Sequence, residues 1–295
     1  MAGYVLSCGS TVDLPREHLA RRDLKCVCFS YRLNGRDYPD DFWSSMSPTL
    51  FYNMIRKGTV VTTSQPGVEA CKNCWKPFLE AGQDILYVSL SSGLSGDINS
   101  ARIATQDFEE LYPDRRIRVV DSLGASSGYG LLMNNLADKR DAGYSLDEAA
   151  AWVEDHKLNL HHWFFSTDLS YYIRGGRISK TAGYIGKLLN ICPLLNMNSQ
   201  GLLVPRDKIR TKRKVIREIV DRMAVHADNG TKYSGKCYVC HSDSLDEARD
   251  VAAAIECRFP NIDGKVEIFN VGVIIGAHTG PGTVALFFWG DRRTD

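Results

Sequence analysis

The sequence lacks both a long hydrophobic run and an excess of charge of either sign. Its 36 lysines and arginines almost balance its 35 aspartates and glutamates, which leaves a formal net charge of +1. This balance argues against nucleic acid as a partner, because a nucleic-acid surface requires concentrated positive charge. No apolar stretch reaches the roughly 20 residues of a membrane span, so we expect at most peripheral membrane contact. The N-terminus has no basic segment followed by an apolar one, so we expect no signal peptide and a cytoplasmic location.

A regular cysteine framework is also missing. The nine cysteines are an odd number at irregular spacings, and without an export signal we expect reduced thiols. Two Cys-x-x-Cys pairs, Cys71/Cys74 and Cys237/Cys240, could together hold zinc. Cys71, however, fits the apolar stripe of a helix, and a spacing of three along a strand puts Cys237 and Cys240 on opposite faces. We therefore predict no metal site.

The first half of the sequence alternates between strands and helices. Apolar segments of β-strand type, such as 4–7 and 85–90, are separated by segments with helical periodicity. This rhythm predicts a parallel sheet covered by helices. The second half mixes strands and helices and has a hairpin signal at 198–201. We predict an α/β fold with an N-terminal parallel-sheet α/β/α domain, residues 1–160, and a second α+β domain, residues 161–295.

The loop Ser91-Ser92-Gly93-Leu94-Ser95-Gly96 directly follows the strand at 85–90 and precedes a helical segment. The first N–H groups of a helix have no partner within the helix, and the helix dipole favours negative charge at that end. Glycines let a ligand approach the backbone closely. We therefore expect free N–H groups in this loop and an anion bound to them.

Hydroxyl-rich turns follow two more predicted strands, at Thr62-Thr63-Ser64 and at Asp121-Ser122. In an open parallel sheet, ligands bind at the carboxyl ends of the strands. Three such turns at the same edge predict one small polar pocket. Thr63 and Ser64 could instead simply cap a helix.

The segment from Gly272 to Thr283 contains His278 followed by Gly280-Pro281-Gly282. The glycines and the proline predict a tight loop that holds the imidazole beside the pocket. An imidazole there could donate a hydrogen bond to an oxyanion. A lone histidine is more often structural, and that alternative stays open.

Ser95 and His278 also allow a serine hydrolase. Ser95 lies at a strand-to-helix turn, and an aspartate such as Asp121 or Asp243 precedes His278 in the chain order of α/β-hydrolases. Asp97, however, occupies the position where the nucleophile turn needs glycine, and its carboxylate would oppose an oxyanion. A phosphate or nucleotide site is the other alternative, but the chain has no Gly-x-x-x-x-Gly-Lys-Ser/Thr loop.

Five motifs occur in the order found in DegV proteins, and through them the whole chain resembles that family. Each motif is weak by itself, and the ordered set is specific. The motifs are Thr62-Thr63-Ser64-Gln65-Pro66, Ser91–Gly96, Leu169–Ile178 with Arg174-Gly175-Gly176-Arg177, Ile209-Arg210-Thr211-Lys212, and His278–Thr283.

DegV proteins are similar to the binding subunit of bacterial fatty-acid kinase, which buries a fatty acid while a separate kinase phosphorylates its carboxylate. The resemblance implies a bacterial, non-enzymatic protein that binds a long-chain fatty acid and partners a fatty-acid kinase catalytic subunit, with no cofactor. It implies carboxylate contacts from Thr63, from Ser95 or, as second choice, Ser92, and from His278. Arg177 and Arg210 then belong to the surface that faces the kinase.

The first turn of the chain departs from the family. It reads Cys8-Gly9-Ser10-Thr11 where the family often has Thr-Asp-Ser-Thr. The missing carboxylate leaves the role of that turn open and does not touch the predicted carboxylate site.

An acyl ligand would gain most of its affinity from its tail. Hydrogen bonds of the head group contribute about 1 kcal/mol each, whereas each buried CH₂ contributes about 0.8 kcal/mol. We therefore expect an apolar tunnel. Its candidate walls, each of which could equally be ordinary core, are Ile185, Leu188, Leu189, Ile191, Leu194 and Val273.

A dense basic segment runs from Arg206 to Arg217. Such a run is usually a solvated helix face. The alternatives are docking to an acidic kinase surface or to anionic lipid.

Overall fold

A computed structural model of the chain describes residues 3–179 and 191–295, whose strands form three sheets. The first, called here the parallel sheet, has the order β2-β1-β6-β7 with every neighbouring pair parallel. Its strands are β1 (Tyr4–Gly9), β2 (Leu24–Val27), β6 (Asp84–Ser89) and β7 (Ile117–Asp121). The parallel sheet predicted from the alternation of strands and helices is therefore confirmed.

The second sheet, called the mixed sheet, has the order β10-β9-β8-β13-β11-β12. Its neighbouring strands are antiparallel except β11 and β12, which are parallel. Its strands are β8 (Leu160–Ser166), β9 (Ile191–Met197), β10 (Leu203–Arg210), β11 (Tyr238–Ser242), β12 (Glu267–Asn270) and β13 (Thr283–Trp289). The hairpin predicted at 198–201 joins β9 to β10, and the α+β character of the second half is confirmed.

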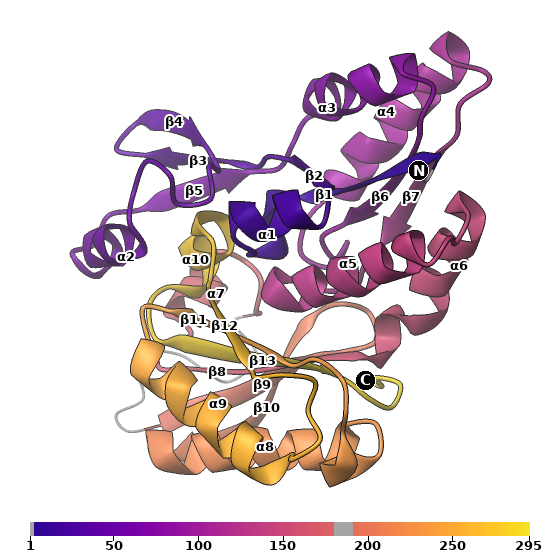
Figure 1. Cartoon of the computed structure of the whole chain (residues 1–295). Helices are drawn as coiled ribbons and strands as arrows, with labels where there is room; N and C mark the ends of the chain where they lie inside the picture. Colours follow the sequence, from indigo (N-terminus) through magenta and orange to yellow (C-terminus); the bar gives the residue numbers. More distant parts are fainter. Residues whose placement is uncertain (1–2, 180–190) are drawn as a thin grey trace.

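The third sheet, called the small sheet, is antiparallel with the order β4-β3-β5 and lies beside the parallel sheet (Figure 1). Its strands are β3 (Ser30–Leu33), β4 (Arg36–Pro39) and β5 (Val61–Ser64). The turn at Thr62-Thr63-Ser64 therefore lies inside a strand of the small sheet. The expectation that three hydroxyl-rich turns follow strands of one parallel sheet is wrong, because strand propensity does not specify which strand is the partner.

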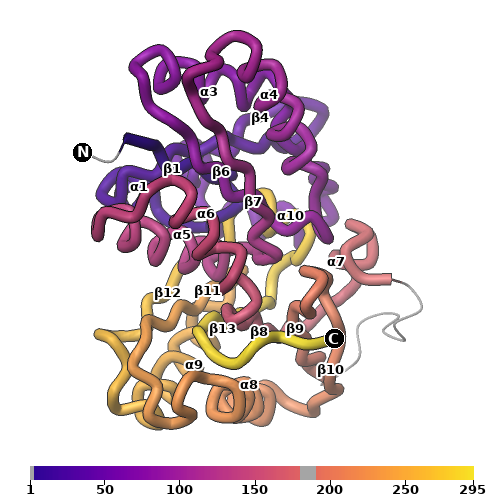
Figure 2. Tube along the Cα trace, turned by 90° about the vertical axis from the view of Figure 1, so that its right-hand side faces the viewer, coloured from indigo at the N-terminus to yellow at the C-terminus, as the bar shows by residue number. Residues whose placement is uncertain are grey.

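Helices and the two large sheets stack in layers (Figures 1 and 2). Helices α3 and α4 cover the outer face of the parallel sheet, α5 and α6 lie between the two large sheets, and α8 and α9 cover the far face of the mixed sheet. Their bounds are α3 (Val68–Glu80), α4 (Asp97–Leu111), α5 (Ser126–Asp141), α6 (Leu146–His156), α8 (Lys212–His226) and α9 (Leu245–Arg258). Each large sheet is thus covered on both faces.

The described chain also contains four shorter α-helices. They are α1 (Arg16–Arg21), α2 (Pro48–Arg56), α7 (Ser170–Arg174) and α10 (Val273–Thr279). Helix α10 packs against α7, α2 and the small sheet, and so brings the end of the chain to its first quarter. Within residues 3–179 and 191–295, every helix is too short or too polar to cross a membrane.

Helix α5 is buried on most of its surface because it lies between two sheets. Eleven of its 16 residues are buried. A Cβ atom at Gly128 would lie 2.4 Å from the Phe287 ring, and one at Gly130 would lie 2.6 Å from the Val12 carbonyl oxygen. Glycine at these two positions lets the helix approach the mixed sheet on one side and the turn after β1 on the other.

The two halves of the chain share a core. The parallel and small sheets come from residues before 122, and the mixed sheet comes from residues after 159. One cluster of buried side chains nevertheless joins Leu6 of β1, Leu132 of α5 and Phe287 of β13. The domain boundary near residue 160 stays a prediction.

The buried Tyr129 hydroxyl ties α5 to the parallel sheet. It accepts a hydrogen bond from the Gly9 N–H at 3.0 Å and donates one to the Val88 carbonyl. We expect Tyr129→Phe to lower the free energy of unfolding by about 1–3 kcal/mol, because two buried backbone groups lose their partner. Denaturant unfolding followed by circular dichroism measures this loss.

The matched control is Tyr144→Phe, since the Tyr144 side chain is exposed. Its unfolding free energy should change by less than about 0.5 kcal/mol. Equal midpoints for Tyr129→Phe and the parent would show that the Tyr129 bridge adds no stability.

Candidate functional site

A cavity of about 430 Å³ lies where β5, the loop after β6, α10 and the mixed sheet meet. Its apolar lining consists of Phe29, Leu90, Leu94, Ala125, Phe164, Tyr172, Met197, Leu203, Val271, Ile274, Ile275, Ala285 and Phe287. Its polar lining consists of Thr63, Ser64, Gln65, Ser95, Ser126, His162, Arg177, Cys240, His278, Thr279 and Thr283. A mostly apolar cavity with a few polar groups is typical of a site for a small organic ligand.

Thr63 and His278 meet in the wall of this cavity. The Thr63 Oγ1 atom lies 2.7 Å from Nε2 of His278, within hydrogen-bond distance. Thr63 lies on β5, where alternate residues point inward, and His278 lies in the last turn of α10. The expected glycine-rich loop around His278 is therefore wrong: the residue is helical, and the helix ends at Gly280, whose φ is +64°.

Gly175 makes room for the His278 ring. A Cβ atom at Gly175 would lie 2.4 Å from Nδ1 of His278, closer than any real contact of that kind. The Gly175 backbone has a φ of −75°, which any residue can adopt, so only the space is critical here. The first glycine of this Gly-Gly pair thus makes room for the imidazole.

His278 is a neutral imidazole in the folded protein. Burial lowers its pKa to about 4, and the positive charge of Arg177 lowers it further in the same direction. A neutral ring has one N–H donor and one acceptor nitrogen. The Thr63 hydroxyl can donate to Nε2 when Nδ1 carries the ring proton, and it can accept from Nε2 when Nε2 carries it.

Arg177 brings a positive charge to the cavity wall. One of its Nη atoms donates to the Leu94 carbonyl oxygen at 3.0 Å, and the other donates to the Gly175 carbonyl oxygen. The guanidinium therefore links the loop after β6 to the segment that carries Gly175. Sequence reasoning placed Arg177 on a surface facing a partner and missed its place in the cavity. Its role toward a partner stays a prediction.

The structure separates the two candidate serines. Ser95 lines the cavity, whereas Ser92 is exposed and is not among the lining residues described above. The Ser92 N–H donates to the carboxylate of Asp121, at 3.2 Å to its Oδ1. Ser95, the first choice from the sequence, is thus the serine that is brought together with Thr63 and His278.

The expected free N–H groups of the 91–96 loop are largely occupied. The amides of Leu94 and Ser95 both donate to the Ser91 carbonyl oxygen, at 2.9 and 3.1 Å. The Gly93 amide donates to the Ser91 hydroxyl, which in turn donates to the Gly201 carbonyl. Ser91 and Asp121 therefore satisfy most amides of the loop, and the side chain of Ser95 is what the loop offers to a ligand.

A buried acid occupies the start of α4. Asp97 accepts a hydrogen bond from the Tyr87 hydroxyl at 3.0 Å, and burial raises its pKa to about 6. Its backbone N–H donates to the Ser95 hydroxyl at 3.3 Å. A carboxyl group at this helix end makes the site less favourable for an anion than an ordinary helix start.

The described contacts do not assemble a hydrolase triad. His278 contacts Thr63 instead of Ser95, and Gly175 lies at its other ring nitrogen. The Asp121 carboxylate accepts hydrogen bonds from the backbone amides of Ser92 and Leu123. The Asp243 carboxylate forms an ion pair with Arg56. The alternative of a serine hydrolase through Ser95 and His278 therefore finds no support in the geometry.

The predicted tunnel walls do not coincide with the walls of the observed cavity. Ile191, Leu194 and Val273 are not among the residues that line the cavity, and Leu194 packs in the core between the mixed sheet and α8. Ile185, Leu188 and Leu189 lie outside the described residues. The observed apolar walls include Phe164 of β8 and Phe287 of β13, and because both strands are buried on both faces their sequences give no signal for which residues face the cavity.

The two Cys-x-x-Cys pairs do not form one zinc site. Cys71 packs in the core under α3, and Cys237 and Cys240 pack in two other cores on opposite faces of the mixed sheet. Burial raises the pKa of the Cys71 and Cys240 thiols to about 12. The expected separation of Cys237 and Cys240 onto opposite faces is confirmed.

Fold and site together define a class: a protein of two large sheets that encloses an apolar cavity with polar groups gathered in its wall. The profile of the family described as "Uncharacterised protein, DegV family" matches residues 8–291. A DegV domain-containing protein of Clostridium perfringens is 34% identical over 293 residues, which cover 99% of each chain. The chain belongs to the DegV family.

Solved structures of similar proteins share the fold. A DegV family protein of Thermus thermophilus, described by its fatty-acid binding, has a TM-score of 0.87 at 26% identity and covers 98% of this chain and 99% of its own. A DegV lipid-binding protein of Thermotoga maritima has a TM-score of 0.84 at 25% identity, with all of both chains covered. The Streptococcus pneumoniae fatty acid kinase B3 protein, loaded with linoleic acid, has a TM-score of 0.83 at 20% identity over 99% of this chain and 100% of its own. At 20% identity the similarity shows the fold alone.

The neutral state of His278 can be measured directly. We expect its ring to titrate near pH 4 in a nuclear magnetic resonance titration of ring-labelled histidine, because burial disfavours the charged form. Arg177→Met should shift this midpoint upward, since it removes a positive charge that also disfavours protonation. A midpoint near 6.5, the ordinary value for histidine, would contradict the buried, uncharged ring.

Proposed function

We propose that this protein binds a long-chain fatty acid in the cavity and presents its carboxylate to a separate fatty-acid kinase, which forms the acyl phosphate. The observation that carries the proposal is the meeting of Thr63, His278, Ser95 and Arg177 in the wall of a cavity that is otherwise mostly apolar. An amphipathic molecule with an acidic head matches this distribution. The protein itself acts as a carrier, without catalysis.

The head group would be held by hydroxyls arranged around one fixed charge. If His278 donates from Nε2 to Thr63 Oγ1, the Thr63 hydroxyl hydrogen is free for the carboxylate. Ser95 offers a second hydroxyl from the opposite loop, and Arg177 offers favourable charge. Hydrogen bonds to a charged acceptor contribute about 1.5–3 kcal/mol each.

The tail would supply most of the affinity. With about ten CH₂ groups buried, the tail contributes about 8 kcal/mol, more than any single contact of the head group. The walls that receive it are aromatic and aliphatic side chains of β8, β13 and α10. Affinity should therefore depend on chain length, and orientation should depend on Thr63, Ser95 and His278.

The family supports a lipid ligand. The Thermus thermophilus and Thermotoga maritima relatives, whose fold and length this chain shares, are described as fatty-acid-binding and lipid-binding proteins. The resemblance of this chain's ordered motifs to those of the DegV family supports Thr63, Ser95 and His278 as the carboxylate contacts. For the kinase partner, the support is the family resemblance together with an exposed basic surface.

That basic surface lies at the edge of the mixed sheet. Arg210 ends β10 and is exposed, and Arg213, Lys214 and Arg217 are exposed on the first turns of α8. Opposite charge on a partner accelerates association and fixes orientation. We propose that Arg210 and its neighbours on α8 contact the kinase.

The head-group site is tested by three variants, Thr63→Val, Ser95→Ala and His278→Ala. Each should weaken fatty-acid binding about 10-fold to 150-fold, the equivalent of one hydrogen bond to a charged acceptor. The measurement is the dissociation constant of a long-chain fatty acid for delipidated protein. Ser92→Ala is the matched control, because Ser92 is exposed outside the cavity, and it should bind like the parent.

Native mass spectrometry and lipid extraction of the freshly purified parent identify the ligand. A co-purifying fatty acid supports the proposal, and a nucleotide contradicts it. Unchanged binding in all three variants would contradict the assigned head-group site. Turnover of an activated short-chain ester that Ser95→Ala abolishes would overturn the carrier function.

The partner surface is tested by Arg210→Glu. With a bacterial fatty-acid kinase catalytic subunit and ATP, this variant should form acyl phosphate at least tenfold more slowly than the parent at limiting protein concentration, because rim charges act mainly on association. Its fatty-acid dissociation constant should not change. Arg102→Glu, an exposed charge reversal on α4 at the other end of the molecule, should behave like the parent (Figure 1).

Equal rates for Arg210→Glu and the parent would exclude Arg210 from the kinase contact. This result would leave the lipid site untouched, since binding is measured separately.

A further inference from the structure

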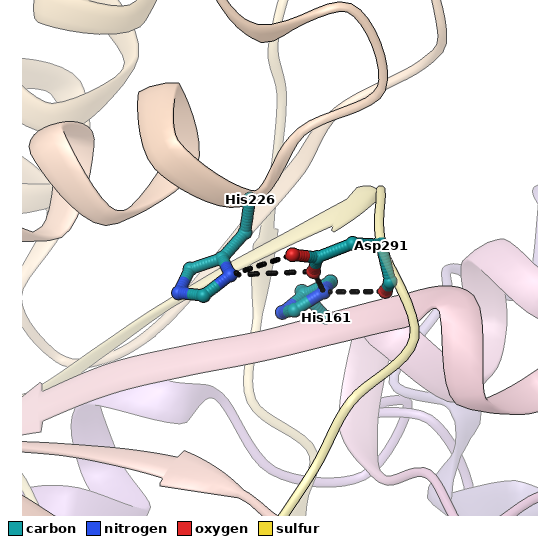
Figure 3. A group of neighbouring side chains, drawn as sticks. All are labelled: His161, His226 and Asp291. Carbon is teal, nitrogen blue, oxygen red and sulfur yellow. Dashed lines mark hydrogen bonds and ion pairs between the residues drawn. The ribbon is translucent and has the colours of Figure 1, made fainter.

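His161, His226 and Asp291 converge on the face of the mixed sheet that lies away from the cavity (Figure 3). His161 belongs to β8, His226 is the last residue of α8, and Asp291 follows β13. Neighbouring residues of a strand point to opposite faces, so His162 lines the cavity while His161 points to this cluster. None of the three takes part in the proposed fatty-acid site.

The ligand atoms of the three residues lie within 4.8 Å of one another. The Asp291 Oδ1 atom is 2.9 Å from Nε2 of His161 and 3.2 Å from Nδ1 of His226. Two atoms bound to one tetrahedral zinc ion at about 2.05 Å lie about 3.3 Å apart. The two separations from the Asp291 oxygen are therefore only a few tenths of an ångström shorter than those around an ion, and all three ligand atoms lie close enough to share one.

The two imidazoles are held in place by the core. The His161 ring stacks on Phe288 with centroids 5.1 Å apart, and the His226 ring stacks on Trp163 at 5.7 Å. His161 is only 3% exposed, and Asp291 is exposed enough to move and to admit an ion. The two imidazoles also stack on each other, with centroids 5.0 Å and planes 23° apart, so His161 is held for the ion while the His226 ring and the Asp291 carboxylate turn toward it.

We propose that His161 Nε2, His226 Nδ1 and an Asp291 carboxylate oxygen bind one divalent transition-metal ion of the zinc type. The Asp291 carbonyl oxygen, 2.9 Å from His161 Nε2, or a water molecule completes four-coordination. The ion takes the place of the ring N–H hydrogens that now face the carboxylate. Each ring binds the ion through a nitrogen that carries no proton, and any ring proton lies on the other nitrogen.

The chemistry of the donors selects the ion. Imidazole nitrogen suits zinc, cobalt, nickel and copper, whereas magnesium and calcium prefer sites made entirely of oxygen. A bound ion would tie the start of β8, the end of α8 and the residues after β13 together. Its expected effect is therefore on the stability of this corner of the mixed sheet.

The test uses the full-length protein without a histidine tag, stripped of metal with a chelator. Isothermal titration with zinc chloride should show one ion per chain, and a parallel titration with magnesium chloride should show none. His226→Ala should raise the zinc dissociation constant at least tenfold. Bound cobalt should give the visible absorption typical of a tetrahedral site.

The variant Asp291→Asn distinguishes a metal site from a cluster that is held by hydrogen bonds alone. Asparagine keeps an oxygen that accepts from both rings but loses the negative charge, so the fold should persist while zinc affinity falls at least tenfold. His156→Ala is the control, because His156 is exposed on α6 outside the cluster, and it should bind zinc like the parent. Absence of zinc binding by the parent, or zinc binding by His226→Ala and Asp291→Asn as tight as that of the parent, would overturn the proposal. Neither result depends on whether the cavity binds a fatty acid.

Discussion

Helix α5 contacts the parallel sheet through one side and the mixed sheet through the other, and its two glycines set how closely the layers approach. Gly128 leaves space for Phe287 and His162 of the mixed sheet, and Gly130 leaves space for the turn after β1. The Tyr129 hydroxyl between them bridges β1 and β6. Because each side of the helix is fixed by a different sheet, its position sets the distance between the two halves of the molecule.

The start of α5 carries this constraint into the cavity. Ala125 and Ser126 line the cavity, and the Ala125 N–H donates to Nε2 of the buried His162 at 3.2 Å. Ser126 has a φ of +54°, a left-handed conformation that a non-glycine residue adopts at some energetic cost. Its hydroxyl donates to Asp13, a fully buried acid whose pKa burial raises well above the usual range. Hydrogen bonds from both halves of the chain therefore offset the strain at this point.

The same layering explains which predictions from the sequence succeeded. The parallel sheet and the hairpin at 198–201 were predicted correctly because each follows from a local pattern of residues in the sequence. The sheet to which Thr63 belongs depends on pairing between β3 and β5, which strand propensity does not encode. His278 is helical because the segment 273–279 packs on α2 and α7, whereas its glycines suggested a loop. The family motifs nevertheless named Thr63, Ser95 and His278, which the structure brings to one cavity.

The roles of other residues were not predicted, because these roles depend on contacts that the sequence does not specify. Nothing in the sequence around Arg177 indicates that its guanidinium reaches the Leu94 carbonyl 83 residues away. The sequence predicted free amides in the 91–96 loop because it does not show that Ser91, inside the same loop, accepts from the amides of Gly93, Leu94 and Ser95. Likewise, Leu194 is apolar on a strand like the true walls, but it points to the face covered by α8. The pattern of apolar residues predicts that a segment is a strand, but it does not show which of the two faces of the strand lines a cavity.

If the protein binds a fatty acid as proposed, the tail and the head group of the lipid have different effects on the release of the phosphorylated product. The apolar walls bind the tail of a fatty acid and of its acyl phosphate equally, so the tail contributes affinity without favouring either molecule. Only the head-group site distinguishes them, and there a neutral His278 and two hydroxyls surround the single charge of Arg177. A site with more cations would hold the more highly charged product more tightly and slow its release. Neutral donors that orient the carboxylate, with little added charge, therefore suit a protein that must bind a lipid firmly and still give up the phosphorylated form.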